Sequence, residues 1–189
     1  RFFSSNSLTS SILYLIPSIN DSNEEIEPFS AAISLLIDLI SDSEEMDWMT
    51  DDVVILTDAF EMTKDEKYAR LASQLLATWF INPATRQTPH LNFGQGIPGI
   101  NTGRGIGIIE TRLLYKLTDA ATRLQASKAW TSDNHDKLKT WFRDYLTWLL
   151  ESPIGLDEAD EHNNHGTYYD VQVINYAIFL GRNDLAKKQ

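Results

Sequence analysis

Apolar residues recur at helical spacing along most of this chain. The segment 29–40, FSAAISLLIDLI, is apolar on nearly every side, which predicts a buried helix. A further helix is expected to begin at Thr50 or Asp51, because both residue types are favoured N-caps. Strand-like content is confined to 51–58, which is short and lies among helical patterns. We therefore expect an all-α fold.

The clearest amphipathic pattern covers residues 65–81 and ends before Pro83, because proline removes a backbone donor and restricts the residue before it. Its expected buried face consists of Tyr68, Leu71, Leu75, Leu76 and Phe80. Helices are also predicted over 105–120, over 131–152 with Ser132 or Asp133 as N-cap, and over 167–181 with Gly181 as C-cap.

The helix over 131–152 is expected to bury Leu138, Trp141, Phe142, Tyr145, Trp148 and Leu149, a face more typical of a core than of a sugar-binding platform. His135, in its first turn, is expected to be solvated. Antiparallel helix pairs joined by longer loops predict an (α/α) toroid or a helical array. The sequence shows no self-similarity at a fixed period, so a fold built from the usual short helical repeats is not supported.

A long stretch rich in proline and glycine, residues 82–105, interrupts the helices. Loops of this length inside a compact domain are uncommon and are usually functional or disordered. Phe93, Ile97 and Ile100 argue for an ordered loop that packs into the molecule. Two interpretations remain open: a structural loop, or a polar cleft lining that carries Asn92, Gln95, Asn101 and Arg104. Arginine suits a carboxylate because its planar fork donates two parallel hydrogen bonds.

The segment DEADEHNNHGTYYDVQ, residues 157–172, holds two of the chain's four histidines. Asn163, Asn164 or Thr167 could cap the following helix. His162 and His165 with the nearby carboxylates Asp160 and Glu161 could instead hold a metal, although the H-E-x-x-H pattern is missing. The third interpretation is a metal-free acid/base site, because a histidine titrates near neutral pH and an asparagine can donate to an anion.

Paired carboxylates in the same segment, Asp157, Glu158, Asp160 and Glu161, also raise the possibility of a hydrolase. A solvated loop is the better interpretation of this acid run, because charge runs usually face water.

The net charge of −11 gives no diffuse basic surface, so nucleic acid is not expected as a partner. The chain has no cysteine, which rules out disulfides, thiolate catalysis and Cys-ligated zinc. Its apolar runs are too short to span a bilayer, and the segment 7–18 resembles a signal peptide only weakly. No membrane partner is therefore expected, and the oligomeric state is not predicted.

Two of these segments, NTGRGIGIIETR and NNHGTYYDVQ, resemble in order the motifs of the alginate lyase superfamily of polysaccharide lyases. The wider resemblance runs from about residue 47 to residue 185. It implies a chondroitin AC/alginate lyase-like (α/α) toroid, here an incomplete barrel of antiparallel helix pairs. We accordingly expect a divergent helical segment over 1–46 and a lyase-like domain over 47–189, truncated at its C-terminus.

The resemblance implies cleavage of a uronate-containing polysaccharide, of alginate or glucuronan type, by β-elimination without a cofactor or metal. Asn164 is similar to the asparagine that neutralises the uronate carboxylate. His165 is similar to the catalytic histidine, a base or a neutralising partner according to the uronate epimer. Asn92, Gln95, Asn101, Arg104 and Tyr168 are expected to bind the substrate.

The family's catalytic tyrosine and arginine lie in a later helical segment than Gln189, so we expect weak or no lyase activity from these 189 residues alone. We also expect an open, apolar-edged face where further helices would pack. A non-catalytic carbohydrate-binding or helical scaffold module on the same fold is the alternative. By family resemblance the protein is expected to be secreted or periplasmic.

Overall fold

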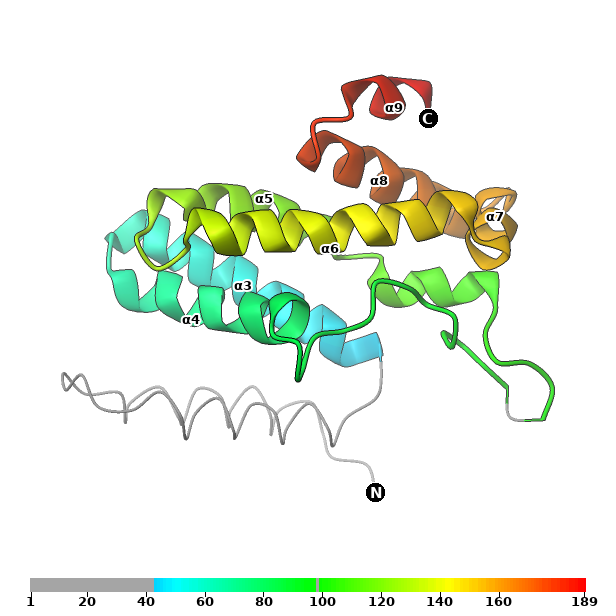
Figure 1. Ribbon diagram of the computed structural model, residues 1–189, viewed down its shortest axis with the longest axis horizontal. Helices are drawn as coiled ribbons and strands as arrows, with labels where there is room; N and C mark the ends of the chain where they lie inside the picture. Colours follow the sequence, from blue (N-terminus) through cyan, green and yellow to red (C-terminus); the bar gives the residue numbers. More distant parts are fainter. Residues whose placement is uncertain (1–42, 98) are drawn as a thin grey trace. The chain divides into compact units, whose positions relative to one another are not determined.

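The computed structural model describes residues 43–97 and 99–189 (Figure 1). Within these ranges every regular element is helical, and an isolated antiparallel bridge joins Ile97 and Asn101. The expected all-α fold is confirmed. The predicted helix over 29–40 and nearly all of the segment 1–46 lie outside the described residues. No helix in the described part is long and apolar enough to cross a membrane.

Two antiparallel helices, α3 (Ser43–Thr63) and α4 (Glu66–Leu76), form the first described pair (Figure 1). Lys64 makes the turn with φ +58°, and the Asp65 side chain caps α4 by accepting from the Lys67 N–H at 3.0 Å. α3 begins before Thr50 and runs across the expected boundary between residues 46 and 47. A π-helical turn, η2 (Ala77–Ile81), continues α4 up to the segment with Pro83.

The buried face of α4 differs in part from the predicted one. Leu76 and, in η2, Phe80 are buried as expected, whereas Tyr68, Leu71 and Leu75 are half-buried. The rest of the buried face consists of small side chains, Ala69, Ala72 and Ser73. Small side chains let helix backbones approach, and a contact built on them leaves the larger residues at its border.

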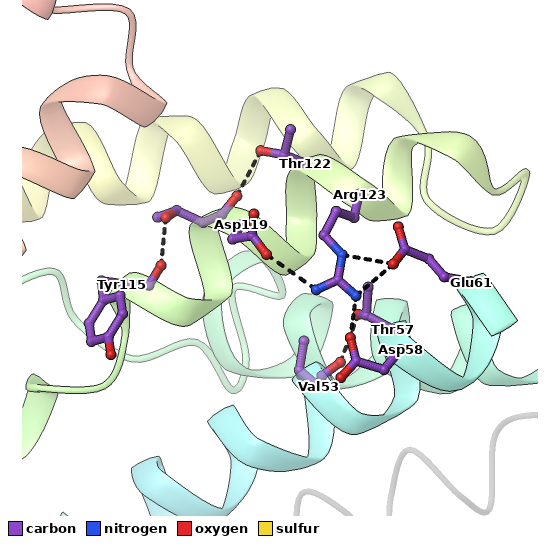
Figure 2. A network of polar contacts seen from close by, with 9 residues as sticks. Val53, Thr57, Asp58, Glu61, Tyr115, Asp119, Thr122 and Arg123 are labelled. Carbon is purple, nitrogen blue, oxygen red and sulfur yellow. Dashed lines mark hydrogen bonds and ion pairs between the residues drawn. The ribbon is translucent and has the colours of Figure 1, made fainter.

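The helix predicted over 105–120 is two elements, the 3₁₀-helix η3 (Gly105–Thr111) and α5 (Tyr115–Arg123), followed by the short turn η4 (Leu124–Ala126). Glycines and β-branched residues dominate GIGIIET, and their low helix propensity explains why no α-helix forms there. In Figure 2, Arg123 of α5 reaches Asp58 and Glu61 of α3 as well as Asp119 of its own helix. This cluster fastens α5 to α3.

Helix α6 (Ser132–Glu151) supplies the aromatic centre of the core. Phe142 lies 4.9 Å from Tyr176, between ring centroids, and Trp141 meets Phe80 edge to face at 4.8 Å. The predicted buried face is confirmed except at Trp148, which is half-buried and stacks on Tyr145.

The N-terminal end of α6 differs from the prediction at two positions. Thr131 is the N-cap in place of Ser132 or Asp133. His135 is buried where a solvated side chain was expected, and its Nδ1 accepts a hydrogen bond from Trp130 Nε1 at 3.2 Å. The preceding Trp130 therefore folds over the first turn, which the helical pattern alone does not indicate.

Three further helices follow: α7 (Pro153–Ala159), α8 (Asn164–Phe179) and α9 (Asn183–Lys188). α8 packs against α5, α6, α7 and η3, and His165 in its first turn contacts Glu158 of α7. A buried polar network centred on Gln172 joins α8 to η3 and α6. Gln172 Oε1 accepts from Thr111 Oγ1 at 2.8 Å and from the Tyr176 hydroxyl at 3.1 Å, and Tyr145 contacts Thr111 at 2.6 Å.

Candidate functional site

Asn163 is the N-cap of α8, so the two residues of the Asn163–Asn164 pair have different roles. Its Oδ1 accepts from the His165 backbone N–H at 2.7 Å, and its Nδ2 donates to Glu161 Oε2 at 2.8 Å. α8 therefore begins at Asn164, three residues before the predicted start at Thr167. The side chain of Asn164 is exposed in the first turn, at the positive end of the helix dipole.

Gly166 is buried where the segment before α8 crosses the first turn of the helix. A Cβ atom at Gly166 would lie 2.0 Å from the carbonyl oxygen of Glu161, far inside van der Waals contact. This close approach holds the segment 161–163, and with it the cap, against the helix. The glycine of the NNHG motif is thus explained by packing.

The side chain of His165 contacts Glu158 of α7. Glu158 Oε1 lies 2.7 Å from His165 Nδ1, and the glutamate side chain is 1% exposed. The prediction of a solvated acid loop is wrong at this position, because Ser152 caps α7 and Pro153 occupies its first turn. That Ser-Pro signal could have revealed the helix, but its spacing does not indicate the contact with His165.

Burial raises the pKa of the Glu158 carboxyl above its usual value, and the neighbouring carboxylates Glu161 and Asp157 raise it further. The hydrogen bond and the charge of His165 act in the opposite direction. A partly enclosed acid–histidine pair is an arrangement that general acid/base chemistry uses.

The glycine-rich loop is held by its backbone and its polar groups. Phe93 and Ile100 are 73% and 77% exposed, so the prediction that they pack inward is wrong. A Cβ atom at Gly103 would lie 2.2 Å from the Asn92 carbonyl oxygen, so the loop segments around Asn92 and Gly103 contact each other through backbone atoms. Glycine permits this approach, and the order of the loop does not need an apolar core.

Three of the predicted substrate-binding side chains take part in this loop structure. Asn92 Oδ1 accepts from Trp148 Nε1 at 2.8 Å, which ties the loop to α6. Gln95 has φ +52° and donates from Nε2 to Glu110 Oε1 at 3.0 Å. Asn101 Oδ1 accepts from the Ile97 N–H at 3.2 Å.

Arg104 and Asn101 line a hollow of about 450 Å³ between the loop and α7. Its other lining residues are Gly103, Gly105, Ile106, Pro153, Ile154 and Asp157. The Gln95 carbonyl accepts from Arg104 Nε at 2.8 Å and so fixes the direction of the guanidinium. Gly105 packs against α7, because a Cβ atom there would lie 2.6 Å from Asp157 Oδ2.

The structure thus forms two neighbouring parts of a candidate site. Asn164 and His165 lie together at the start of α8, and Arg104 and Asn101 lie together in the hollow. Neither Asn164 nor His165 lines the hollow, and α7 connects the two parts through its consecutive residues Asp157 and Glu158.

Tyr168, Asn92 and Gln95 do not line the hollow either. The Tyr168 side chain is half-buried, one turn after Asn164. Within 43–97 and 99–189, no group of three His, Asp or Glu side chains is placed to hold a metal ion.

A search of curated proteins gave no match. Among solved structures, an alginate lyase from Bacteroides ovatus, whose crystal structure was determined at 1.60 Å resolution, matches with a TM-score of 0.75 and 39% sequence identity. The match covers 78% of this chain and 39% of the Bacteroides chain, so this chain spans well under half the length of that enzyme. It confirms the predicted (α/α) toroid class.

The family model named alginate lyase matches residues 23–189. The match begins well before residue 47, so it takes in part of the segment 1–46 that was expected to be divergent. Its span contains the whole glycine-rich loop and the whole NNHG motif. The chain belongs to the alginate lyase family.

Proposed function

We propose that this protein is a polysaccharide lyase that cleaves a uronate-containing polysaccharide, of alginate or glucuronan type, by β-elimination. The observation that carries the proposal is the exposed first turn of α8, where Asn164 stands beside a histidine held by a buried carboxylate. Membership of the alginate lyase family supports the reaction class.

In this reaction a base removes the C5 proton of the uronate, and the electron pair moves toward the carboxylate as an enolate-like intermediate. The C4–O4 bond then breaks, the C4–C5 double bond forms, and the leaving O4 takes a proton from an acid. Negative charge builds on the carboxylate in the transition state. Fixed hydrogen-bond donors at that place therefore lower the barrier more than they stabilise the bound substrate.

We assign the carboxylate to Asn164 and to the N-terminal end of α8. The Asn164 amide can donate to the carboxylate, and the dipole of a helix start favours an anion there. His165, on the same turn, takes the C5 proton or assists in neutralising the carboxylate, according to the uronate epimer.

The hollow beside α7 would bind a neighbouring uronate of the same chain. Arg104 supplies the cationic fork for a second carboxylate, and Asn101 lies beside it. Asn92 and Gln95 contribute amide groups and hold the loop, while Tyr168 flanks the first turn of α8. The net charge of −11 makes such a local positive site necessary for an anionic polymer.

The acid that protonates O4 is not assigned to a residue of this chain. The family resemblance places a tyrosine and an arginine in a later segment, and the chain spans 39% of the Bacteroides enzyme. We also propose, from the family alone, that the protein acts outside the cytoplasm, as a secreted or periplasmic enzyme.

The test incubates the full-length protein that carries this chain with alginate, with glucuronan and with a carboxyl-reduced polymer. Products with an unsaturated uronate end, detected by ultraviolet absorbance and by mass, are expected from one of the two polyuronates and not from the reduced polymer. Binding of oligosaccharides without such products would favour the non-catalytic carbohydrate-binding alternative. Products without a double bond would indicate a hydrolase.

A further inference from the structure

Glu158 is a buried acid to which no role has been assigned, and it contacts the proposed catalytic histidine. We infer that Glu158 is a positioning residue that holds neutral His165 in the Nδ1–H tautomer, with the Nε2 lone pair directed toward the substrate. The inference rests on the proposed function only for the identity of that substrate.

The environment of Glu158 indicates that its contact with His165 is specific. The carboxyl is 1% exposed, Oε1 lies 2.7 Å from His165 Nδ1, and Oε2 is buried without a hydrogen-bond partner among the described residues. Burying a carboxyl group is costly unless it is hydrogen-bonded, and His165 is the hydrogen-bond partner of the Glu158 side chain among the described residues. The contact with the imidazole is therefore the interaction that this buried acid provides.

The rest of His165 is fixed as well. Its backbone N–H donates to the Asn163 cap, which sets where the residue sits on α8. With Nδ1 turned to Glu158, the second ring nitrogen lies on the other side of the imidazole. Nε2 makes no hydrogen bond with the described residues, and it is not among their enclosed unpartnered atoms. This nitrogen therefore faces solvent, where a substrate would approach.

The protonation state decides what His165 can do. If Glu158 is ionised, neutral His165 donates from Nδ1, and Nε2 can accept the C5 proton. If Glu158 is a neutral acid, it donates to Nδ1, and Nε2 carries a hydrogen and can only donate. Burial and the facing carboxylates Asp157 and Glu161 favour the neutral acid, while His165 favours the carboxylate. A carboxylate that orients a histidine is a recurrent device for selecting the tautomer.

The experiment measures the tautomer directly by ¹⁵N NMR of histidine-labelled protein, and the chain has four histidines to assign. For the 189-residue chain we expect neutral His165 to carry its proton on Nδ1. Glu158→Leu should move that proton to Nε2, the form preferred by a histidine side chain free in water, and Glu158→Asp should restore at least part of the Nδ1–H form. The exposed His162 should keep its signals in every variant.

A wild-type His165 protonated on Nε2, or an Nδ1–H form that persists in Glu158→Leu, would overturn the inference. If Glu158→Leu fails to fold, the wild-type tautomer and the Glu158→Asp variant still decide the matter. In the full-length enzyme we expect Glu158→Leu to lower kcat by about 100-fold or more with little change in KM, because a wrong tautomer removes a transition-state interaction.

The kinetic and NMR results separate the two proposals. An inactive wild-type enzyme with an Nδ1–H His165 would end the lyase proposal and leave the positioning role of Glu158 intact. An unchanged kcat together with a changed tautomer would remove the functional importance of that positioning.

Discussion

Gln172 gives the sharpest test of how α8 is held against the core. Its side chain is fully buried and accepts from the hydroxyl of Thr111 in η3, which also contacts the Tyr145 hydroxyl of α6. Gln172→Met keeps the length and shape of the side chain but removes both the amide acceptor and the amide donor. We expect the variant to fold with reduced stability.

The expected loss in the free energy of unfolding depends on which buried groups lose their hydrogen-bond partner. The Thr111 hydroxyl can donate instead to the Ile108 carbonyl, which is 2.9 Å away. The Tyr176 hydroxyl donates to Gln172 Oε1 at 3.1 Å and sits on a fully buried side chain, so it has no such replacement. One buried hydroxyl left without a hydrogen-bond partner costs about 1–3 kcal/mol. We therefore predict a loss of about 2 kcal/mol in the free energy of unfolding, or about 4–8 °C in Tm.

The assay is urea unfolding followed by tryptophan fluorescence, with Asn175→Leu as the matched control. Asn175 is an amide on the same helix, half-buried, and its Nδ2 donates to the Val171 carbonyl at 2.8 Å within that helix. Removing this amide leaves no buried group without a hydrogen-bond partner, so the free energy of unfolding should fall by no more than about 0.5 kcal/mol. If Gln172→Met costs no more than Asn175→Leu, the argument that Gln172 organises the core is refuted.

Two further predictions concern Gly166 and His135. Gly166→Ala should displace the segment before α8 by at least about 1 Å, because its Cβ would lie 2.0 Å from the Glu161 carbonyl oxygen, and a shift of that size costs about 100-fold in kcat. The displacement is measured by the NMR chemical shifts of the capping segment, and the loss of activity by kcat of the full-length enzyme. Burial lowers the pKa of His135 below 6.5, and its Nδ1 accepts from Trp130, so the unfolded chain takes up the proton first. Stability should fall as the pH drops through 6.5 toward the folded-state pKa, and His135→Gln should flatten this part of the stability profile measured by urea unfolding.

Each of these two predictions has a matched control. Thr167→Ala removes an exposed hydroxyl that donates to the Asn163 carbonyl at 3.3 Å, and because the Thr167 backbone N–H donates to the same carbonyl, both the segment and kcat should stay nearly unchanged. His162→Gln removes an exposed histidine and should keep the pH slope of the wild type. A Gly166→Ala variant with native shifts, or a His135→Gln variant with an unchanged slope, would contradict the structural argument.

Helical periodicity predicted where helices lie better than it predicted what each one buries. It located α4 and α6 well, because their apolar residues recur over several turns. It could not show that small residues such as Ala69 would form the close contact of α4. It also missed the break between η3 and α5, because apolar spacing persists there while glycine and β-branched residues weaken the helix.

The candidate site was only partly predictable for a similar reason. The NNHG motif indicated Asn164 and His165, and the turn chemistry indicated a cap near them. The link to Glu158 depends on how α7 folds back onto α8, which no local pattern encodes. The predicted packing of Phe93 and Ile100 failed because glycine contacts, which apolar pattern does not reveal, hold that loop.

The central claim, that His165 performs the proton chemistry of a uronate lyase, is tested most directly by replacing it. Formation of the unsaturated uronate is followed by ultraviolet absorbance for the full-length wild type, for His165→Ala and for Thr167→Ala. We predict clear product from the wild type and from Thr167→Ala, and a loss of at least about 100-fold in kcat for His165→Ala, the size expected for a general acid/base group. An undiminished rate in a correctly folded His165→Ala variant, or no product from the folded wild type on either polyuronate, would contradict the claim.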